Sequence, residues 1–135
     1  MKILVDTNIL LSAMWFKDSR VAEALLFVAK NCELVLCEHN ITEMREVLKR
    51  KTPDVLGDAD VFLYKLKYTL IVSAGSTEKI IRDPKDQPIL DAAITNKVDI
   101  ILTGDKDFLS LKLKNPKIMT VSQFLNFVGR GENFS

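Results

Sequence analysis

The sequence predicts an α/β fold in which a parallel sheet is covered by helices on both faces. Short apolar runs that suit buried strands alternate with longer segments whose apolar residues recur at helical spacing. This alternation continues over the whole chain, as it does in α/β proteins with helices on either side of a sheet. No repeat and no change of composition marks a second domain, so we expect one domain over residues 1–135, with a frayed tail at 129–135.

The first half of the chain is expected to hold two strands and four helices. The run Lys2–Val5 is short and apolar and ends at Asp6, which suits a buried strand. Polar residues that can cap helices follow it, first Thr7 or Asn8, and then Asp18 or Ser19. The expected elements are strand 2–5, helices 9–16 and 20–30, strand 33–37, a helix from 40 or 42 to about 52, and a helix from 57 to about 70.

The second half is expected to hold three strands separated by helices. Asp86 can cap a helix that tolerates Pro88 in its first turn, and Ser122 can cap the last helix. The expected elements are strand 71–73, a polar loop up to residue 84, helix 86–97, strand 99–103, short helix 105–111, strand 118–121 and helix 123–128. The sheet would therefore contain about four or five strands.

The composition favours an ordinary folded protein. Hydrophobic residues make up 47% of the chain, the formal net charge is +1, and only two cysteines are present. The start of the chain suits neither a signal peptide nor a membrane span, so we expect a cytoplasmic protein. Two local basic runs form either a solvated face or a rim that steers phosphates toward an acidic site, and the sequence does not decide between these two roles. These runs are Arg45, Lys49, Arg50 and Lys51, and Lys112, Lys114 and Lys117.

Four acidic residues in separate segments are the candidates for chemistry. Asp6 and Asp105 follow apolar strands, and the carboxyl ends of parallel strands are where open α/β sheets bind ligands. Glu43 lies at the border of the apolar stripe of its helix, whereas Glu46 lies further round. Asp86 stands at a helix start, where it could be a cap or a ligand.

These carboxylates would repel one another if they were gathered without a cation. Their convergence therefore predicts a divalent cation, and hard oxygen ligands favour Mg²⁺ or Mn²⁺. Two such ions about 3.5–4 Å apart can assist an in-line displacement at phosphorus. Auxiliary roles are open to four more residues: Asn8, which could orient Asp6 or contact a phosphate, Asp91, Asp107, and Thr103 with its hydroxyl beside Asp105.

Four segments together resemble the PIN domain, most closely the VapC-like toxins of prokaryotic toxin–antitoxin systems. These segments are Val5-Asp6-Thr7-Asn8, Glu43, Asp83-Pro84-Lys85-Asp86-Gln87, and the block from Leu102 to Leu109. The resemblance covers essentially the whole chain. It implies a Rossmann-like three-layer sandwich and a Mg²⁺- or Mn²⁺-dependent endoribonuclease with catalytic acids at Asp6, Glu43, Asp86 and Asp105. Gln87 and Asp91 depart from residues usual in the family, but neither change removes a carboxylate.

The resemblance also implies partners, namely an RNA substrate, a second copy of the chain, and a small cognate antitoxin. The apolar stretch 61–70 is a possible contact for the last two. Two other functions stay open. One is a catalytically inactive PIN-fold binding module. The other is a phosphoryl-transfer enzyme of the haloacid-dehalogenase type, which would require an aspartate two residues after Asp6, where this chain has Asn8.

Overall fold

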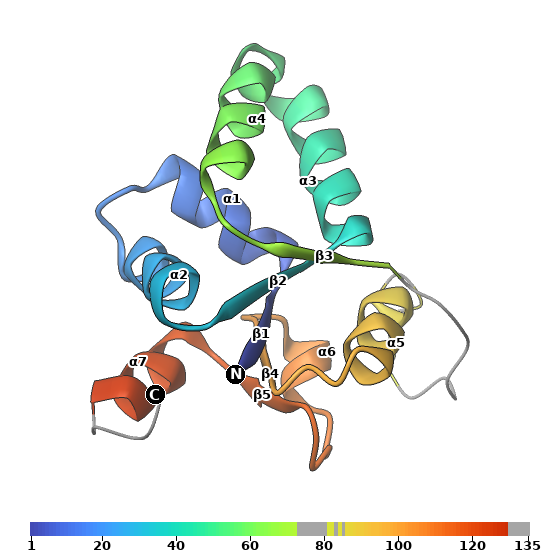
Figure 1. Ribbon diagram of the computed structural model, residues 1–135. Helices are drawn as coiled ribbons and strands as arrows, with labels where there is room; N and C mark the ends of the chain where they lie inside the picture. The colour runs from blue at the N-terminus through green and yellow to red at the C-terminus, as the bar shows by residue number, and fades with distance from the viewer. Residues whose placement is uncertain (73–80, 83, 85, 130–135) are drawn as a thin grey trace.

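A parallel sheet forms the centre of the molecule, as the sequence predicts (Figure 1). The computed structural model describes residues 1–72, 81, 82, 84 and 86–129. The five strands lie in the order β3-β2-β1-β4-β5, and every neighbouring pair is parallel. The strands are β1 Lys2–Val5, β2 Glu33–Cys37, β3 Thr69–Ile71, β4 Ile100–Leu102 and β5 Lys117–Met119.

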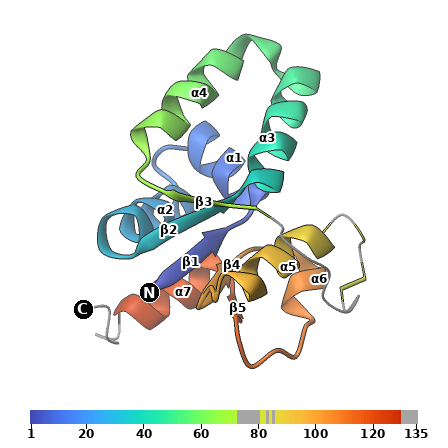
Figure 2. The ribbon, with the colours of Figure 1, turned by 45° about the vertical axis from the view of Figure 1, so that its right-hand side comes forward.

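Helices cover both faces of this sheet, which gives three layers (Figures 1 and 2). On β1, Ile3 and Val5 pack on one side and Leu4 on the other, because side chains alternate along a strand. Helices α1–α4 and α7 cover the first side, and α5 and α6 cover the second. The helices are α1 Thr7–Trp15, α2 Arg20–Asn31, α3 Glu38–Lys51, the short 3₁₀ helix η1 Pro53–Val55, α4 Leu56–Lys65, α5 Gln87–Thr95, α6 Lys106–Leu109 and α7 Val121–Gly129.

Several predicted boundaries in the first half of the chain were wrong because tertiary contacts decide them. Strand β3 takes Thr69 and Leu70, which were expected in a helix, because they pair with Val35 and Leu36 of β2. Helix α4 therefore ends at Lys65. Helix α3 begins directly after β2, at Glu38, without a side-chain cap.

Two predicted caps also differ. Asp6, and not Thr7 or Asn8, caps α1 through its carboxylate. Thr120 replaces Ser122 as the cap of α7, since it exchanges hydrogen bonds with Gln123: the Thr120 hydroxyl accepts from the Gln123 N–H at 3.1 Å, and the Gln123 side chain accepts from the Thr120 N–H at 2.9 Å.

Most of the loop expected before Asp86, and most of the expected C-terminal tail, lie outside the described residues. Gly129, which was assigned to that tail, ends α7. Within the described part of the chain, every helix is too short or too polar to cross a membrane.

Candidate metal centre

The site lies where the chain reverses direction across the sheet. Strand β1 is the middle strand; β2 and β3 follow on one side, and β4 and β5 lie on the other. Parallel α/β sheets bind ligands at such switch points, beyond the carboxyl ends of the strands. Val5 pairs with Leu102, and the Asp6 N–H donates to the Leu102 carbonyl at 3.2 Å. The residues that follow β1 and β4 therefore lie side by side.

Asp6 is the most buried acid of the site, with 6% of its surface exposed. Its Oδ1 accepts a hydrogen bond from the Ile9 N–H at 2.9 Å, and its Oδ2 accepts one from the Thr103 hydroxyl. Burial raises the pKa of Asp6, and the negative charges of Asp105 and Glu43 raise it further, while the two hydrogen bonds oppose this shift. The Ile9 N–H and the Thr103 hydroxyl thus stabilise the negative charge of Asp6, whereas the charges of Asp105 and Glu43 destabilise it.

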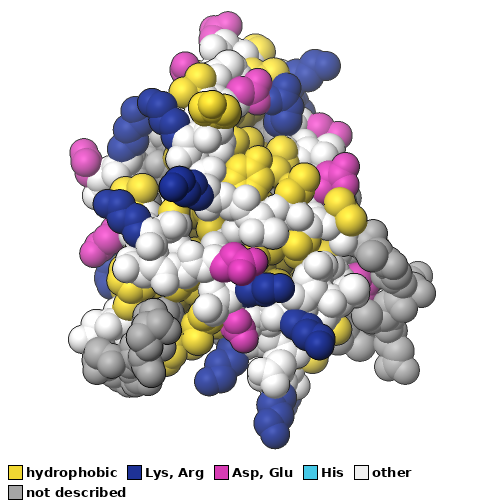
Figure 3. Space-filling view, viewed as in Figure 1, with side chains coloured by type: hydrophobic (Ala, Val, Ile, Leu, Met, Phe, Trp, Pro, Cys, Tyr) yellow, Lys and Arg dark blue, Asp and Glu magenta, His cyan; other side chains and the backbone are white. Residues whose placement is uncertain are grey.

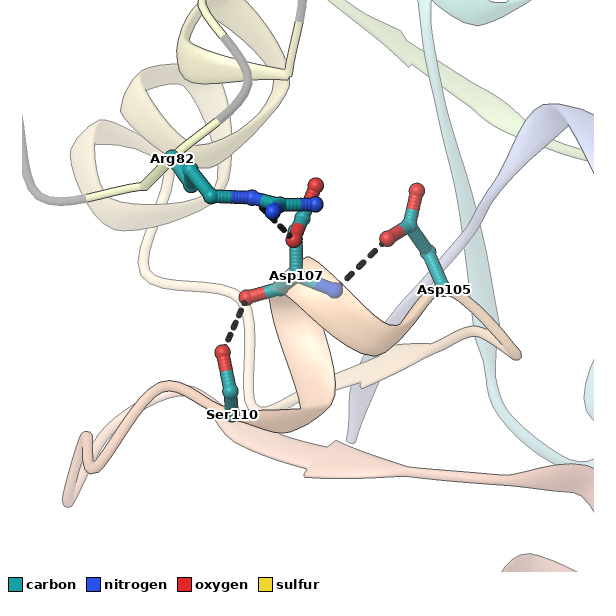
Figure 4. A network of polar contacts seen from close by, with 4 residues as sticks. All are labelled: Arg82, Asp105, Asp107 and Ser110. Carbon is teal, nitrogen blue, oxygen red and sulfur yellow. Dashed lines mark hydrogen bonds and ion pairs between the residues drawn. The ribbon is translucent and has the colours of Figure 1, made fainter.

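Three further carboxylates gather beside β4. One oxygen each from Asp86, Asp105 and Asp107 lies within 4.8 Å of the others. The Asp105 carboxylate accepts from the Asp107 N–H at 2.8 Å, which caps the short helix α6 (Figure 4). Asp107 also pairs with the exposed Arg82, whose Nε lies 3.0 Å from Oδ1 (Figure 4). Asp107, for which the sequence suggested only an auxiliary role, is therefore itself a member of this cluster.

Glu43 reaches the same place from α3. It is half-buried, whereas Glu46 is exposed, as the helical stripe predicted. A small cavity of about 30 Å³ is lined by Asp6, Glu43, Asp86 and Asp105 together with other residues. All four acids expected to be catalytic therefore border one cavity.

Asn40 also lines this small cavity and was not singled out from the sequence. Its side chain is fully buried, and its Nδ2 donates to the Thr7 hydroxyl at 3.1 Å. Its Oδ1 has no hydrogen-bond partner within the part of the chain that the structure describes. A buried oxygen without a partner requires an explanation, and a water or an ion in the cavity would supply one.

Asp86 occupies the N-cap position of α5 but makes no capping hydrogen bond with its side chain. Its backbone at φ −89° and ψ −15° is helical, unlike the extended backbone of the Asp6 cap. The carboxylate lines both the small cavity and the larger cleft next to it. A cap role therefore does not account for Asp86.

The remaining auxiliary residues have distinct positions. Thr103, fully buried, bridges the site: its hydroxyl donates to Asp6 and accepts from the Asp105 N–H at 3.0 Å. Asp91 is buried and accepts from Gln87 Nε2 at 2.8 Å, and it does not line the cavity. Asn8 lines the cleft but, in the described structure, makes no hydrogen bond to Asp6, so Thr103 has the orienting role considered for Asn8.

A larger cleft of about 590 Å³ continues from the cavity along α3. We call it the acidic cleft. Its lining from α3 is His39, Thr42, Glu43, Glu46, Val47 and Arg50, and its other walls are Thr7, Asn8, Asp86 and Asp105. Helical spacing from Glu43 could have identified His39 and Arg50 as its neighbours on one face. The second basic run, Lys112, Lys114 and Lys117, does not line this cleft. Lys117 begins β5, so it lies at the amino end of its strand, whereas the site lies beyond the carboxyl ends.

Together, the sheet order and the gathered acids define a three-layer α/β protein with a candidate cation site at its switch point. The chain belongs to the PIN domain family, whose model matches residues 2–107. That membership removes the haloacid-dehalogenase alternative. No curated protein matches the sequence.

Among solved structures, the fold is similar to a chain in the crystal structure of VapBC2 from Rickettsia felis bound to a DNA fragment from its promoter. The TM-score is 0.69 at 18% sequence identity, and the alignment covers 89% of this chain and 98% of the other. At this identity the match establishes the fold, and the predicted three-layer architecture is confirmed.

Proposed function

We propose that this protein is a Mg²⁺- or Mn²⁺-dependent endoribonuclease that hydrolyses phosphodiester bonds of RNA. One observation carries the proposal: Asp6, Glu43, Asp86 and Asp105, from four separate segments, border a single cavity. PIN-family membership makes hydrolysis of a nucleic acid the first chemistry to test.

The donor set fits a hard divalent cation. Every acid bordering the cavity offers carboxylate oxygens, and Asn40 adds a buried oxygen that has no partner among the described residues. The neighbouring charges of Asp105 and Glu43, which raise the pKa of Asp6, are those that a cation would compensate. Asp6, Glu43, Asp86 and Asp105 would hold the ion, with Asp107 beside them.

When bound, a divalent cation supplies positive charge to polarise the phosphoryl group and to acidify water. The chain itself supplies position. Thr103 and the first turn of α1 fix both oxygens of Asp6, and the Asp107 N–H fixes one oxygen of Asp105. Acids held this way need little rearrangement when the ion and substrate bind.

The direct test is to incubate the purified protein with total RNA in Mn²⁺ or in EDTA and to sequence the cut ends. We expect Mn²⁺-dependent cleavage that Asp6→Asn abolishes. Asp18→Asn is a matched control, because Asp18 is an exposed aspartate outside the cavity. Cleavage by Asp6→Asn at the wild-type rate would contradict the assignment.

The alternative is a PIN-fold binding module without activity. Calorimetric titration with Mn²⁺ separates the two functions, because a degenerate site would bind the ion poorly. Binding of Mn²⁺ that is lost in Asp6→Asn supports the nuclease, whereas absent binding in the wild type favours the module.

For partners, we propose a homodimer and a small antitoxin, the role of this chain being that of the toxin of such a pair. The surface over α1 and α4 supports a contact there: Trp15, Phe16 and Val61 are exposed, and Tyr64 is 90% exposed. Figure 3 shows hydrophobic side chains on the upper part of the molecule, over α4 and between α4 and α3. Light scattering is expected to give the mass of a dimer, and a monomer at high concentration would remove that part of the proposal.

A further inference from the structure

One face of α3 forms a wall of the acidic cleft over about three turns. The lining residues His39, Glu43, Glu46 and Arg50 follow one another at intervals of three or four positions, which places them on one side of the helix. At a rise of about 1.5 Å per residue, Arg50 lies about 10 Å along the helix axis from Glu43. The cleft thus connects the candidate cation site to a positively charged residue.

Arg50 is exposed and forms no ion pair with any residue that the structure describes. In contrast, Arg45 of the same basic run is paired with Asp60 of α4. Lys49 and Lys51 do not line the cleft. A cation in the last turn of a helix is also favoured by the helix dipole, but Lys49 and Lys51 already supply that charge at the end of α3. The dipole therefore gives no reason for Arg50 to face the cleft.

We propose that this face of α3 binds the single strand of RNA next to the scissile bond, and that Arg50 binds one of its phosphates. The inference rests on the proposed ribonuclease function and adds a substrate subsite to it. A strand entering an acidic cleft is repelled by carboxylates wherever a cation does not neutralise them, so its flanking phosphates need a positive side chain. The planar guanidinium of arginine binds phosphate through two parallel hydrogen bonds.

The position of Arg50 limits which phosphate it contacts. Glu46 lies one turn closer to the site and repels a phosphate there, so the contact falls beyond Glu46. With a rise of about 3.4 Å per stacked nucleotide, 10 Å corresponds to a phosphate within about three nucleotides of the scissile one. A contact to phosphate alone carries no base preference.

The test measures binding of a labelled single-stranded oligoribonucleotide by fluorescence anisotropy at several salt concentrations, with Ca²⁺ as the hard divalent cation that neutralises the acidic site. Gel electrophoresis after each titration checks that the strand is intact. Losing one charged phosphate contact is expected to weaken binding about tenfold in Arg50→Gln. It should also reduce the slope of log affinity against log salt by about 0.7. Arg50→Lys should recover part of the affinity, and Glu46→Gln should tighten binding.

Lys49→Gln is the matched control, since it removes the same charge from the adjacent position outside the cleft, and it should bind within about twofold of the wild type. The inference is overturned if Arg50→Gln binds like the wild type, or if Lys49→Gln weakens binding equally. Duplex RNA bound as tightly as the single strand, with the same dependence on Arg50, would overturn the single-strand assignment. Cleavage of RNA by the wild type in Mn²⁺ tests the proposed function separately, so failure of either can be distinguished.

Discussion

The hydroxyl of Thr103 donates a hydrogen bond to Oδ2 of Asp6, and the two residues are 97 positions apart in the sequence. The same hydroxyl oxygen accepts from the Asp105 N–H. One buried side chain therefore ties the acid after β1 to the loop after β4 that carries the second acid. Because Thr103 is fully buried, this contact fixes the positions of Asp6 and Asp105 relative to each other and to the core.

Replacing Thr103 by valine is expected to destabilise the protein by about 1–3 kcal/mol, because the buried carboxylate of Asp6 and the half-buried N–H of Asp105 lose their partner while the volume is conserved. The pKa of Asp6 should rise further, since the Thr103 hydrogen bond lowers it. Urea unfolding measures the first effect. Thr103→Ser retains the hydroxyl and serves as control; equal stability of the valine variant and the wild type would show that the bridge is weak.

The stability of the metal-free protein should carry a pH dependence from Asp6. Its pKa in the folded state is raised, mainly by burial, above the value of about 3.9 in an unfolded chain. Between these two pKa values the folded state binds more protons, so this contribution is present at low pH and is lost as pH rises through the folded pKa. Urea unfolding in EDTA from pH 4 upward should show wild type losing stability relative to Asp6→Asn. A constant difference between the two would contradict this.

Asp105→Asn should melt no lower than the wild type in EDTA. Asparagine retains the oxygen that accepts from the Asp107 N–H, and the substitution removes a charge that repels Asp6. Differential scanning fluorimetry measures this, and Mn²⁺ should raise the melting temperature of the wild type more than that of the variant. If the variant melted much lower in EDTA, Asp105 would have a structural role.

A cation bound at the proposed site would compete with Arg82 for Asp107, since the two side chains form an ion pair. The Arg82 side chain is 86% exposed, so the pair contributes only about 0.2–1 kcal/mol. Arg82→Gln is therefore expected to change stability little and to strengthen Mn²⁺ binding up to about fivefold, the affinity equivalent of that energy. Calorimetry measures the affinity for Mn²⁺. Lys106→Gln is the control, because Lys106 is a neighbouring basic residue that forms no ion pair in the described structure. Weaker Mn²⁺ binding in Arg82→Gln would mean that the arginine assists the site.

The sequence was sufficient to predict the kind of fold and that the four acids would lie close together. Alternation of apolar strands with helical segments follows from burial on both faces of a sheet, and it is visible in runs such as Ile100–Leu102. Asp6 and Asp105 could be assigned to one edge because Asp6 directly follows such a run and Asp105 follows another after Thr103 and Gly104. Glu43 could be placed at the border of α3 from helical periodicity alone.

Tertiary structure decided the contacts between these segments. Thr69 and Leu70 form a strand because they pair with β2, although the local sequence pattern predicted a helix there. The order of β1 beside β4 brought Thr103 to Asp6. The tertiary structure also revealed that Asn40 Oδ1 has no partner among the described residues and that Arg50 of the basic run lines the cleft. Local sequence patterns encode which face of an element is buried, but which element lies against that face depends on contacts between residues far apart in the chain.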